Sequence, residues 1–291
     1  MKLYLFLVSL LVSGLASSQT VKVMTYNIRY ASTSDGVNVW ENRKEKLPAL
    51  IQKYDPDLVG LQEVLHGQLM DILKALPQYG YIGVGRDDGK EKGEYSAILY
   101  KKDRFDVGWQ KTSWLSETPD VPGSKSWDAA ITRVFTRGEF IDKATVANTG
   151  KKSRKSGAPN KIYFYNTHFD HIGKEARAKS VPIIKKATLQ EIGSQFDKQR
   201  NFLIITGDFN SQPAEEPYKT MIDDRIKDAR PAESTQGTFC TFSVNGPPCT
   251  LIDHIFYGPG LKRINYQVIM DNDGTYYPSD HLPVMAEFEF K

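Results

Sequence analysis

Residues able to bind a metal or transfer a proton recur in this sequence directly after short apolar runs. Each run is rich in β-branched or aromatic residues, which is typical of a β-strand that ends where the polar residues begin. In α/β folds, strand ends and the adjoining loops are the usual places for catalytic sites. The pattern occurs at Tyr26-Asn27, Gln62-Glu63, His168-Phe169-Asp170, Gly207-Asp208-Phe209-Asn210, Asp253-His254 and Ser279-Asp280-His281.

Four carboxylates and two histidines gathered at strand ends would place like charges close together. A bound divalent cation would offset that repulsion. Carboxylates, an amide oxygen and water are the hard oxygen ligands that Mg²⁺ or Mn²⁺ prefers. Any one of these residues alone carries little weight, although a carboxylate inside the apolar run LIDHIF is costly unless it is paired. The six groups are Glu63, Asp208, Asp253, Asp280, His168 and His281.

The elements that must position these groups alternate between strands and helices along the chain. No stretch resembles an interdomain linker, and the stretch 149–158 indicates a long solvated loop, so we expect one α/β domain. Strands are predicted over 21–28, 57–62, 95–100, 131–140, 161–167, 202–206, 251–256 and 283–290, and helices over 40–52, 68–76 and 174–200, the last with a break at Pro182.

The composition fits a globular domain with a slight positive charge. Hydrophobic residues make up 40% of the 291 residues, which is enough for a sizeable core. The formal net charge of +3 permits an anionic substrate but does not demand a polyanionic one. The chain has no phosphate-binding loop of the G-x-x-x-x-G-K-[ST] type.

The first residues follow the three-part pattern of a signal peptide. Lys2 precedes an apolar run over residues 3–12, and Ala16 and Ser18 occupy the −3 and −1 positions of a cut before Gln19. The run is too short to span a bilayer comfortably, and a buried first helix is the alternative. We therefore expect a cleaved segment 1–18 and a mature domain 19–291 that is periplasmic or secreted.

The two cysteines, Cys240 and Cys249, fit an exported protein. The Asn245-Gly246 pair between them favours a reversal of the chain, so we expect a disulfide-pinned loop, with two free thiols as the alternative. A structural zinc site needs about four ligands, and no histidine follows at the usual spacing.

In combination and order, the motifs resemble those of the endonuclease/exonuclease/phosphatase superfamily, the group that includes pancreatic-type deoxyribonuclease. The matching segments are MTYNIRY, DLVGLQEV, GEYSAILYKK, YNTHFDH, ITGDFNSQP, LIDHIF and SDHLPV, which span residues 24–284. The resemblance, to a secreted bacterial-type member, implies a four-layered α/β sandwich. Two central mixed β-sheets would be flanked by helices, with the site at one mouth.

The resemblance also implies a role for each residue at the reacting centre. Glu63 and Asp280 would bind Mg²⁺ or Mn²⁺, with Asn27 beside them at the metal or the phosphate. Asp208 would orient and deprotonate the attacking water. His281 would handle the second proton or stabilise the phosphate.

Further residues would hold the substrate or support the site. Asp253 would fix the ring tautomer of His281. Asn210, His168 and, more loosely, Arg133 would contact the phosphate. In related nucleases, the carboxylate that Glu94 matches pairs with the histidine that corresponds to His168. Asp170 is expected to support the site. His66 and His171 are given no role.

The implied activity is phosphoester hydrolysis by a metal-positioned water attacking in line, with no obligatory protein partner and a monomeric chain. A nucleic acid, a phospholipid head group or a small phosphorylated metabolite all remain candidate substrates. A non-catalytic binding module on the same fold is the less favoured alternative.

Two sequence features bear on the choice of substrate. A nuclease would use a basic loop together with base-stacking aromatics such as Tyr95 or Trp127. A phospholipase C or sphingomyelinase-like enzyme would expose an apolar hairpin, for which the stretch 112–127 offers Trp114, Leu115 and Trp127. The cations of the basic loop are Lys151, Lys152, Arg154, Lys155 and Lys161.

Overall fold

The computed structural model describes residues 20–147, 158–193 and 200–291. The expected signal peptide, the first four cations of the basic loop and part of the predicted helix 174–200 lie outside these ranges. Within the part of the chain that the structure describes, no helix is both long and apolar enough to cross a bilayer.

Two six-stranded mixed sheets form the centre of the protein, and each contains one parallel pair of strands. Sheet A has the order β11-β12-β1-β2-β4-β3, and sheet B has the order β5-β6-β7-β8-β10-β9. The strands of sheet A are β1 (Thr20–Asn27), β2 (Leu58–Val64), β3 (Tyr79–Ile82), β4 (Tyr95–Lys101), β11 (Leu261–Val268) and β12 (Val284–Phe290). Those of sheet B are β5 (Phe105–Trp114), β6 (Val134–Asp142), β7 (Asn160–His168), β8 (Asn201–Asp208), β9 (Lys227–Asp228) and β10 (Asp253–Tyr257).

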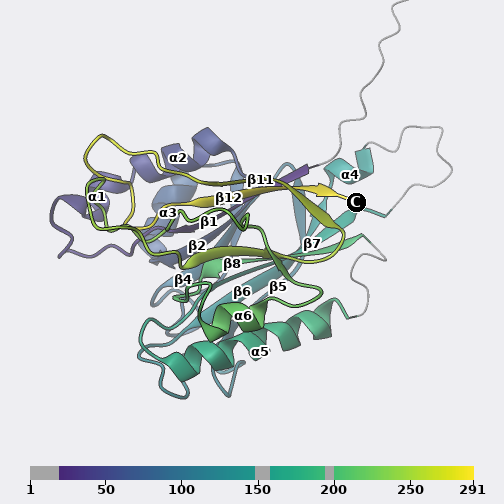
Figure 1. The fold of residues 1–291 in the computed structure, drawn as a ribbon. Coiled ribbons are helices and arrows are strands. Elements are labelled where there is room, and N and C mark those ends of the chain that lie inside the picture. Colours follow the sequence, from purple (N-terminus) through teal and green to yellow (C-terminus); the bar gives the residue numbers. More distant parts are fainter. Residues whose placement is uncertain (1–19, 148–157, 194–199) are drawn as a thin grey trace, which may run out of the picture.

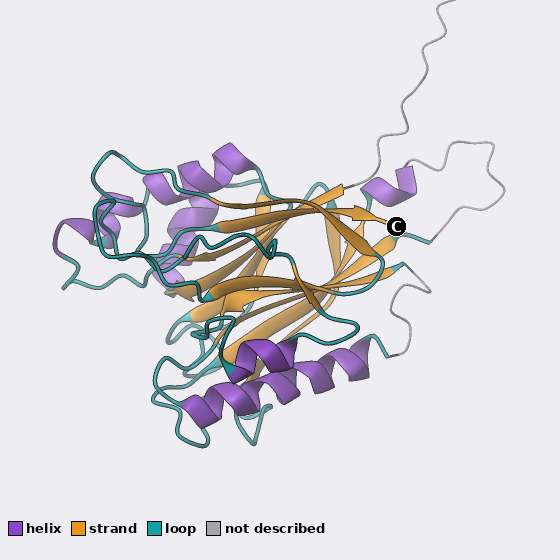
Figure 2. Ribbon diagram, in the orientation of Figure 1, coloured by secondary structure: helices purple, strands orange, loops and turns teal. Residues whose placement is uncertain are grey.

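Helices cover the outer faces of both sheets, so the molecule has four layers (Figures 1 and 2). This confirms the predicted four-layered sandwich. One helical layer packs on sheet A and the other on sheet B. The helices on sheet A are α1 (Trp40–Arg43), α2 (Lys46–Tyr54) and α3 (His66–Ala75), those on sheet B are α5 (Lys174–Glu191) and α6 (Glu216–Met221), and the short η1 (Gly36–Asn38) and α4 (Ala144–Ala147) complete the set.

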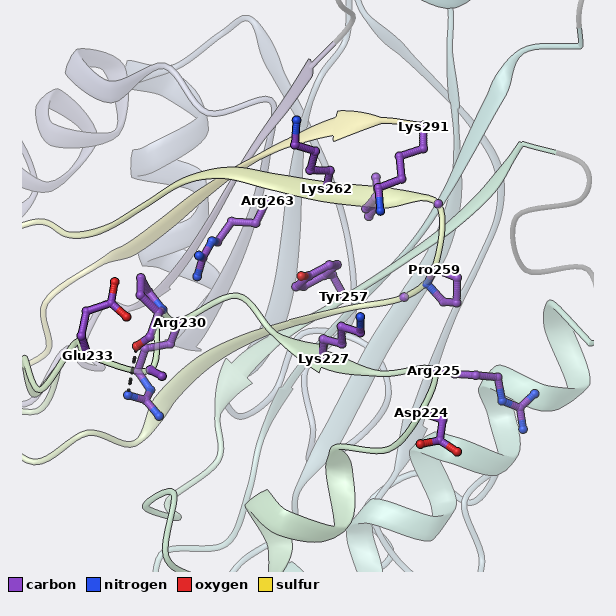
Figure 3. A pocket seen from close by; sticks show the side chains of 15 residues that line it. Asp224, Arg225, Lys227, Arg230, Glu233, Tyr257, Pro259, Lys262, Arg263 and Lys291 are labelled. Carbon is purple, nitrogen blue, oxygen red and sulfur yellow. Dashed lines mark hydrogen bonds between the residues drawn. The ribbon is translucent and has the colours of Figure 1, made fainter.

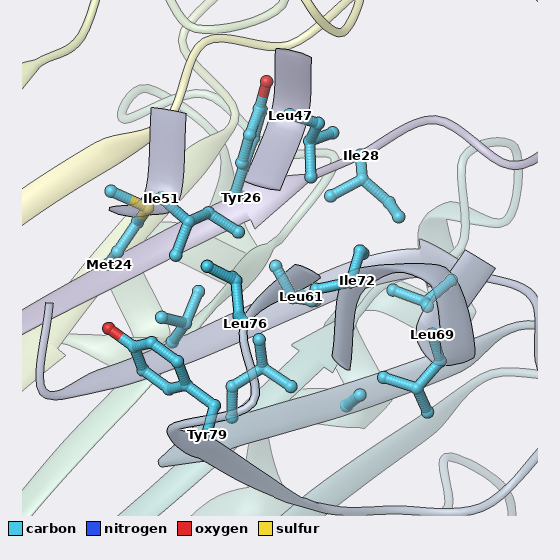
Figure 4. Packing of buried hydrophobic residues seen from close by; sticks show 14 of the residues in the cluster. Met24, Tyr26, Ile28, Leu47, Ile51, Leu61, Leu69, Ile72, Leu76 and Tyr79 are labelled. Carbon is cyan, nitrogen blue, oxygen red and sulfur yellow. The ribbon is translucent and has the colours of Figure 1, made fainter. Parts of the chain in front are cut away.

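The packing of β1 illustrates how strand alternation builds this core. Met24, Tyr26 and Ile28 point toward the helices and pack with apolar side chains of α2 and α3 (Figure 4). Val21 and Val23 point the other way and pack in the cluster between the two sheets. Because successive side chains of a strand face opposite sides, both faces of sheet A are buried and the site can form only at an end of the strands.

The strands that were not predicted from the sequence are all edge strands. β3, β5, β9 and β11 each lie at one edge of a sheet and contain partly or fully exposed positions. An edge strand exposes one side, so it lacks the apolar run that revealed the central strands. The short helix α6 was also not predicted.

Two predicted helices differ from the observed ones. The helix expected over 40–52 is divided into α1 and α2, with Pro48 in the first turn of α2, where a proline is tolerated. The helix α5 runs through Pro182 without a break, because Val181 and Ile184 on either side are buried against sheet B. It ends at Glu191, two residues before Gly193, whose φ of 62° is typical of a helix C-terminus.

The same alternation brings the polar residues at the strand ends together at one end of the sandwich. On β8, Phe202, Ile204 and Thr206 face the space between the sheets, so Asp208 faces it too. On β1 and β7, alternation from Val23 and Phe164, which face the space between the sheets, turns Asn27 and His168 toward the same space. β10 is antiparallel to β8 and pairs Asp253 directly with Asp208, so the start of β10 lies at this end of the sandwich.

Glu63 reaches the site through a β-bulge. The register between β2 and β4 shifts between Leu61 and Val64, and Glu63 has a φ of 61°. In regular alternation Glu63 would point toward the helices, as Leu61 does. A bulge inserts one residue and re-aims its side chain, and the strained backbone marks a functional position.

Candidate active site

The predicted residues converge on a cavity of about 540 Å³ at one mouth of the sandwich. Asn27 and Asp253 are buried just behind its wall, where they contact residues that line it. Eight of the predicted residues line the cavity directly, and these are Glu63, Glu94, Arg133, His168, Asp208, Asn210, Asp280 and His281.

A carboxylate–histidine pair forms the back of the cavity. Nδ1 of His281 lies 2.8 Å from Oδ2 of Asp253, and Nε2 of the same ring lies 3.8 Å from Oδ2 of Asp208. The backbone N–H of Asp253 donates to Oγ1 of Thr238 at 3.1 Å. The Asp253 carboxylate therefore fixes the ring, and Nε2 of His281 is directed toward Asp208 and the cavity.

Burial and the neighbouring charges set the protonation of this group. Burial, followed by the charge of Asp253, raises the pKa of Asp208 to about 7. Burial would lower the pKa of His281, but Asp253 and the carboxylates of Asp208 and Asp280 outweigh it and raise the pKa to about 10. A carboxylate that titrates near neutrality suits a general base, and an imidazolium suits a donor to phosphate oxygen.

His168 and Asn210 lie on the other side of Asp208. The Asn210 amide nitrogen lies 3.1 Å from Nε2 of His168 and donates to the Phe169 carbonyl at 3.1 Å, while the Asn210 backbone N–H donates to Asp208 Oδ1 at 2.9 Å. Burial, together with the charges of Arg133 and Arg86, lowers the pKa of His168 well below its usual value. His168 is therefore a neutral hydrogen-bonding group.

The carboxylates of Glu63 and Asp280 supply oxygen atoms expected of a magnesium site, and Asn27 lies beside them with its Oδ1 accepting the backbone N–H of Arg29 at 3.0 Å. Asn27 donates through Nδ2 to Glu63 Oε1 at 3.1 Å and to Asp208 Oδ2 at 3.0 Å, and so ties the two sheets together. Asp280 lines the same cavity, and burial raises its pKa. Nε of Arg29 lies 3.9 Å from its Oδ2, which is too long for a hydrogen bond.

This oxygen set fits a hard divalent cation. Besides burial, the charge of Glu63 raises the pKa of Asp280, so the two carboxylates repel each other, and a cation held by Glu63 and Asp280 with Asn27 beside them would remove that cost. A second set of atoms, from Asp208, Asp253 and His281, lies within 4.8 Å of one another. Since Asp253 and His281 already bond to each other there, we assign that set to proton transfer.

We expect Glu63→Gln to raise the Mg²⁺ concentration needed for half-maximal activity by about 10-fold or more. The substitution keeps the shape of the side chain and removes the charge that binds a hard cation. The measurement is a Mg²⁺ titration of hydrolysis, with Glu233→Gln at an exposed position as the matched control. An unchanged half-maximal concentration would remove Glu63 from the metal site.

Arg133 and Asp170 form a supporting group at the edge of the cavity. Asp170 accepts backbone N–H bonds from Ile131, Ile172 and Gly173 at 3.2, 2.9 and 2.7 Å. Burial would raise the pKa of Asp170, but these donors outweigh it and lower the pKa. Its Oδ2 lies 3.8 Å from Nε of the buried Arg133, so it also orients that guanidinium.

Glu94 has a different partner from the one that the resemblance implied. Its Oε2 accepts a hydrogen bond from Nη1 of Arg86 at 2.7 Å, whereas Nδ1 of His168 is buried without a hydrogen-bond partner. The competing guanidinium is the physical reason, because an ion pair with Arg86 stabilises Glu94 more than a neutral imidazole would. Burial raises the pKa of Glu94, and the charge of Arg86 opposes that rise.

Several residues of the site were not identified from the sequence. Arg29, Tyr30, Arg86 and Phe239 line the cavity, and so does His171, to which the sequence analysis gave no role. Nδ1 of His171 lies 3.1 Å from Nη2 of Arg133. Arg29 and Tyr30 could have been identified from the sequence, because they come two and three residues after Asn27, at the end of β1.

Arg43 is a further residue that the sequence analysis missed, and it acts outside the cavity. Its buried guanidinium donates to the backbone carbonyls of Ile28 at 2.6 Å, Arg29 at 3.1 Å and Pro278 at 3.1 Å. Arg43 therefore ties the loop after β1 to the loop that carries Asp280. Arg43 could have been identified because it lies on the apolar side of the amphipathic helix predicted over 40–52, where an unpaired cation would be costly.

The two cysteines form a disulfide in the segment that joins the two halves of the site. Cys240 and Cys249 close a loop with a sequence separation of 9 residues. The backbone N–H of Cys240 donates to the Asp280 carbonyl at 2.9 Å. The neighbouring Thr238 accepts from Leu282 through its carbonyl and from Asp253 through its hydroxyl. The segment therefore holds β10 against the loop that carries Asp280 and His281.

We expect the double variant Cys240→Ser, Cys249→Ser to lose about 10- to 100-fold in turnover, because small misplacements of catalytic groups are costly. The short loop limits its effect on the free energy of unfolding to about 2–3 kcal/mol. Turnover and chemical denaturation of the double variant and the oxidised wild type provide the comparison. If the double variant loses this stability but keeps full turnover, the disulfide does not position the site.

A second cavity, also of about 540 Å³, lies at the opposite end of β10 (Figure 3). Tyr257, Lys227, Lys262 and Lys291 surround it, and it contains no histidine. Its carboxylates, Asp224 and Glu233, are not joined to a histidine as Asp253 is joined to His281 in the first cavity. The chemistry therefore belongs to the first cavity.

The chain belongs to the Endonuclease/Exonuclease/phosphatase family, whose sequence model matches residues 24–281. The match covers every predicted catalytic and metal-binding residue. The resemblance inferred from the motifs is thereby confirmed at the level of the family.

Two solved structures from Bacteroides thetaiotaomicron are similar to this chain over nearly its whole length. One, described as an endonuclease/exonuclease/phosphatase family protein, is 37% identical, covers 94% of this chain and 98% of that chain, and has a TM-score of 0.82. The other, a mannosyl-6-phosphatase, is 36% identical, covers 93% and 100% of the two chains, and has a TM-score of 0.81. More distantly, exodeoxyribonuclease III of Haemophilus influenzae is 22% identical over 88% of this chain and 98% of its own length.

Proposed function

We propose that this protein is an exported, Mg²⁺- or Mn²⁺-dependent phosphatase that hydrolyses phosphomonoesters of small metabolites, with sugar phosphates as the leading class. The observation that carries this proposal is the form of the site. The catalytic groups line a cavity of about 540 Å³, a size that encloses a small ligand.

The chain's own residues divide the work of hydrolysis among them. Asp208 accepts the proton of the attacking water, since its pKa of about 7 lies near neutral pH. His281, held by Asp253, donates from Nε2 to the phosphoryl oxygens as charge develops. Asn210, His168 and Arg133 line the same cavity, and each hydrogen bond that such a group donates to the phosphoryl oxygens is typically worth about 3 kcal/mol.

When bound by Glu63 and Asp280, with Asn27 beside them, the divalent cation supplies charge neutralisation for the phosphoryl group and the leaving oxygen. Each protein group then holds its place through contacts that already exist. Asn27 spans Glu63 and Asp208. The site is therefore organised before the substrate arrives, which is the condition for strong electrostatic stabilisation.

The other candidate substrates have weaker support. Trp114 and Leu115 are buried, so they do not form the exposed apolar hairpin that a lipid phosphodiesterase would use. Tyr95 is also buried and cannot stack on a base. A nuclease remains the second candidate, because exodeoxyribonuclease III is among the relatives, although it is less similar than the mannosyl-6-phosphatase.

Export is part of the proposal and rests on residues 1–18 and on the Cys240–Cys249 disulfide. Disulfides persist in oxidising compartments. N-terminal sequencing of the protein recovered from its native host tests this point. A mature chain that begins at Gln19 would agree with it, whereas a full-length cytoplasmic chain would contradict it.

A substrate panel tests the proposed reaction. Purified mature protein with Mg²⁺ or Mn²⁺ would be offered hexose phosphates, inositol phosphates, DNA, RNA and sphingomyelin, with EDTA as the metal-free control. We expect the highest kcat/KM on a hexose phosphate and no turnover in EDTA. Efficient cleavage of DNA or RNA with no phosphate released from sugars would overturn the proposal in favour of a nuclease.

A further inference from the structure

A compact loop between β3 and β4 carries Arg86 into the active-site cavity. The Arg86 backbone N–H donates to the Glu94 carbonyl at 3.1 Å, and the Arg86 carbonyl accepts from Nε1 of Trp114 at 2.6 Å. Two glycines allow the loop to close. A Cβ on Gly85 would lie 2.2 Å from the Lys92 carbonyl oxygen, and Gly93 has a φ of 80°. The position of Arg86 is therefore built into the fold.

The guanidiniums around Glu94 have unused donors. Arg86 binds Oε2 of Glu94 through Nη1, and its buried Nε, 3.8 Å from Oδ1 of Asp87, has no hydrogen-bond partner among the described residues. Arg133 is 5% exposed, and within the same part of the chain its Nε and Nη1 also lack hydrogen-bond partners. Buried polar groups are almost always hydrogen-bonded, so these two guanidiniums, which both line the cavity, have hydrogen-bonding capacity that the protein does not use.

The Arg86–Glu94 pair is suited to a hydroxyl group. A sugar hydroxyl can donate to the carboxylate and accept from the guanidinium at the same time. A second phosphate, as in a nucleic acid backbone, has no proton to donate to the Glu94 carboxylate. The pair therefore favours a neutral, hydroxyl-rich leaving group over a polyanion.

An aromatic ring on the same cavity completes the environment. Phe239 is 38% exposed, lines the cavity and packs against His281 with ring centroids 4.9 Å apart. An exposed apolar ring beside polar donors and acceptors matches a sugar, which has both C–H faces and hydroxyl edges. Small-molecule sites commonly combine apolar surface with a few placed polar groups in this way.

We infer that Arg86 and Glu94 form the subsite that recognises the hydroxyl groups of a sugar phosphate's leaving group, with Arg133 beside them on the phosphoryl group. The inference rests on the proposed phosphatase function and assigns its specificity to these residues. Arg86 and Glu94 act on the leaving group and not on the phosphoryl transfer itself, so their loss falls mainly on KM for the sugar substrate.

The test compares a hexose 6-phosphate with p-nitrophenyl phosphate, which has no hydroxyl groups on its leaving group. Wild type, Arg86→Gln and Glu94→Gln would be assayed on both, with Arg225→Gln in the second cavity as the matched control. We expect the ratio of the two kcat/KM values to fall by about 10- to 100-fold in both subsite variants, the loss expected for hydrogen bonds to charged groups. The control should keep the wild-type ratio.

Deoxy analogues of the hexose phosphate supply a second readout that does not depend on any variant folding. Wild type should lose kcat/KM for at least one deoxy analogue, and Arg86→Gln should be insensitive to that same deletion. Equal activity of wild type on all analogues, or equal losses on both substrates in the variants, would overturn the inference. Absence of any sugar phosphate hydrolysis by wild type would instead contradict the proposed function.

Discussion

Replacing Asp208 by asparagine is expected to lower kcat by about 10²–10⁴-fold, the usual loss when a proton-transfer group is removed. Asp208 is buried at the meeting point of the site, where Asn27 donates to its Oδ2 and the backbone of Asn210 donates to its Oδ1. Asparagine keeps the size of the side chain but cannot accept the proton of the attacking water. The measurement is kcat at saturating Mg²⁺ and substrate.

The same variant should not lose stability. Burial and the charge of Asp253 raise the pKa of Asp208, which means that the ionised form is disfavoured in the folded protein. Removing the charge relieves that cost and offsets the loss of one of the two hydrogen bonds that the carboxylate accepts from Asn27 and Asn210, so the thermal midpoint of Asp208→Asn should stay close to that of wild type without added metal. Asp224→Asn, at an exposed position, is the matched control. Near-normal turnover in folded Asp208→Asn would contradict the assigned role.

Replacing His281 by alanine is expected to cost about 10²–10⁴-fold in kcat, because it removes the donor that faces the phosphoryl group. Asp253→Asn should also lose activity, since the amide no longer holds the ring in the orientation set by the 2.8 Å contact to Nδ1. Residues that act as a unit have non-additive effects. The double variant should therefore be little worse than His281→Ala alone.

A matched histidine outside the cavity controls for general damage. His66 contacts Tyr95 at 3.1 Å and does not line the cavity, so His66→Ala should keep turnover close to that of wild type. Losses that multiply in the double variant would show that Asp253 and His281 act separately. In that case Asp253 would have to serve another function in the site.

The catalytic centre could be anticipated from the sequence because its residues follow strong apolar runs. Asp208 and His168 end central strands, and strand alternation fixes which side of the sheet they face. Glu63 is a different case. Its motif predicted a metal ligand, although regular strand alternation would turn the side chain toward the helices. The β-bulge, with a φ of 61° at Glu63, explains how the side chain reaches the cavity instead.

The rim of the site could not be predicted in the same way. Arg86 lies in a loop of glycines and charged residues without a periodic pattern, and its role depends on contacts with Glu94, eight residues further on, and with Trp114 at the end of β5. Phe239 and His171 are likewise brought to the cavity by tertiary packing. Loop residues of this kind have no signal in a single sequence, because neither strand nor helix periodicity orients them.

Hydrolysis in ¹⁸O-labelled water tests the central claim most directly, namely that water activated in this cavity attacks phosphorus in a metal-dependent reaction. A hexose phosphate would be hydrolysed with Mg²⁺ by wild type and by Asp208→Asn, and the products analysed by mass spectrometry. We predict one ¹⁸O atom in the inorganic phosphate, none in the sugar, and no reaction in EDTA or with the variant on the same timescale. Label in the sugar, or unchanged hydrolysis in EDTA, would contradict the account.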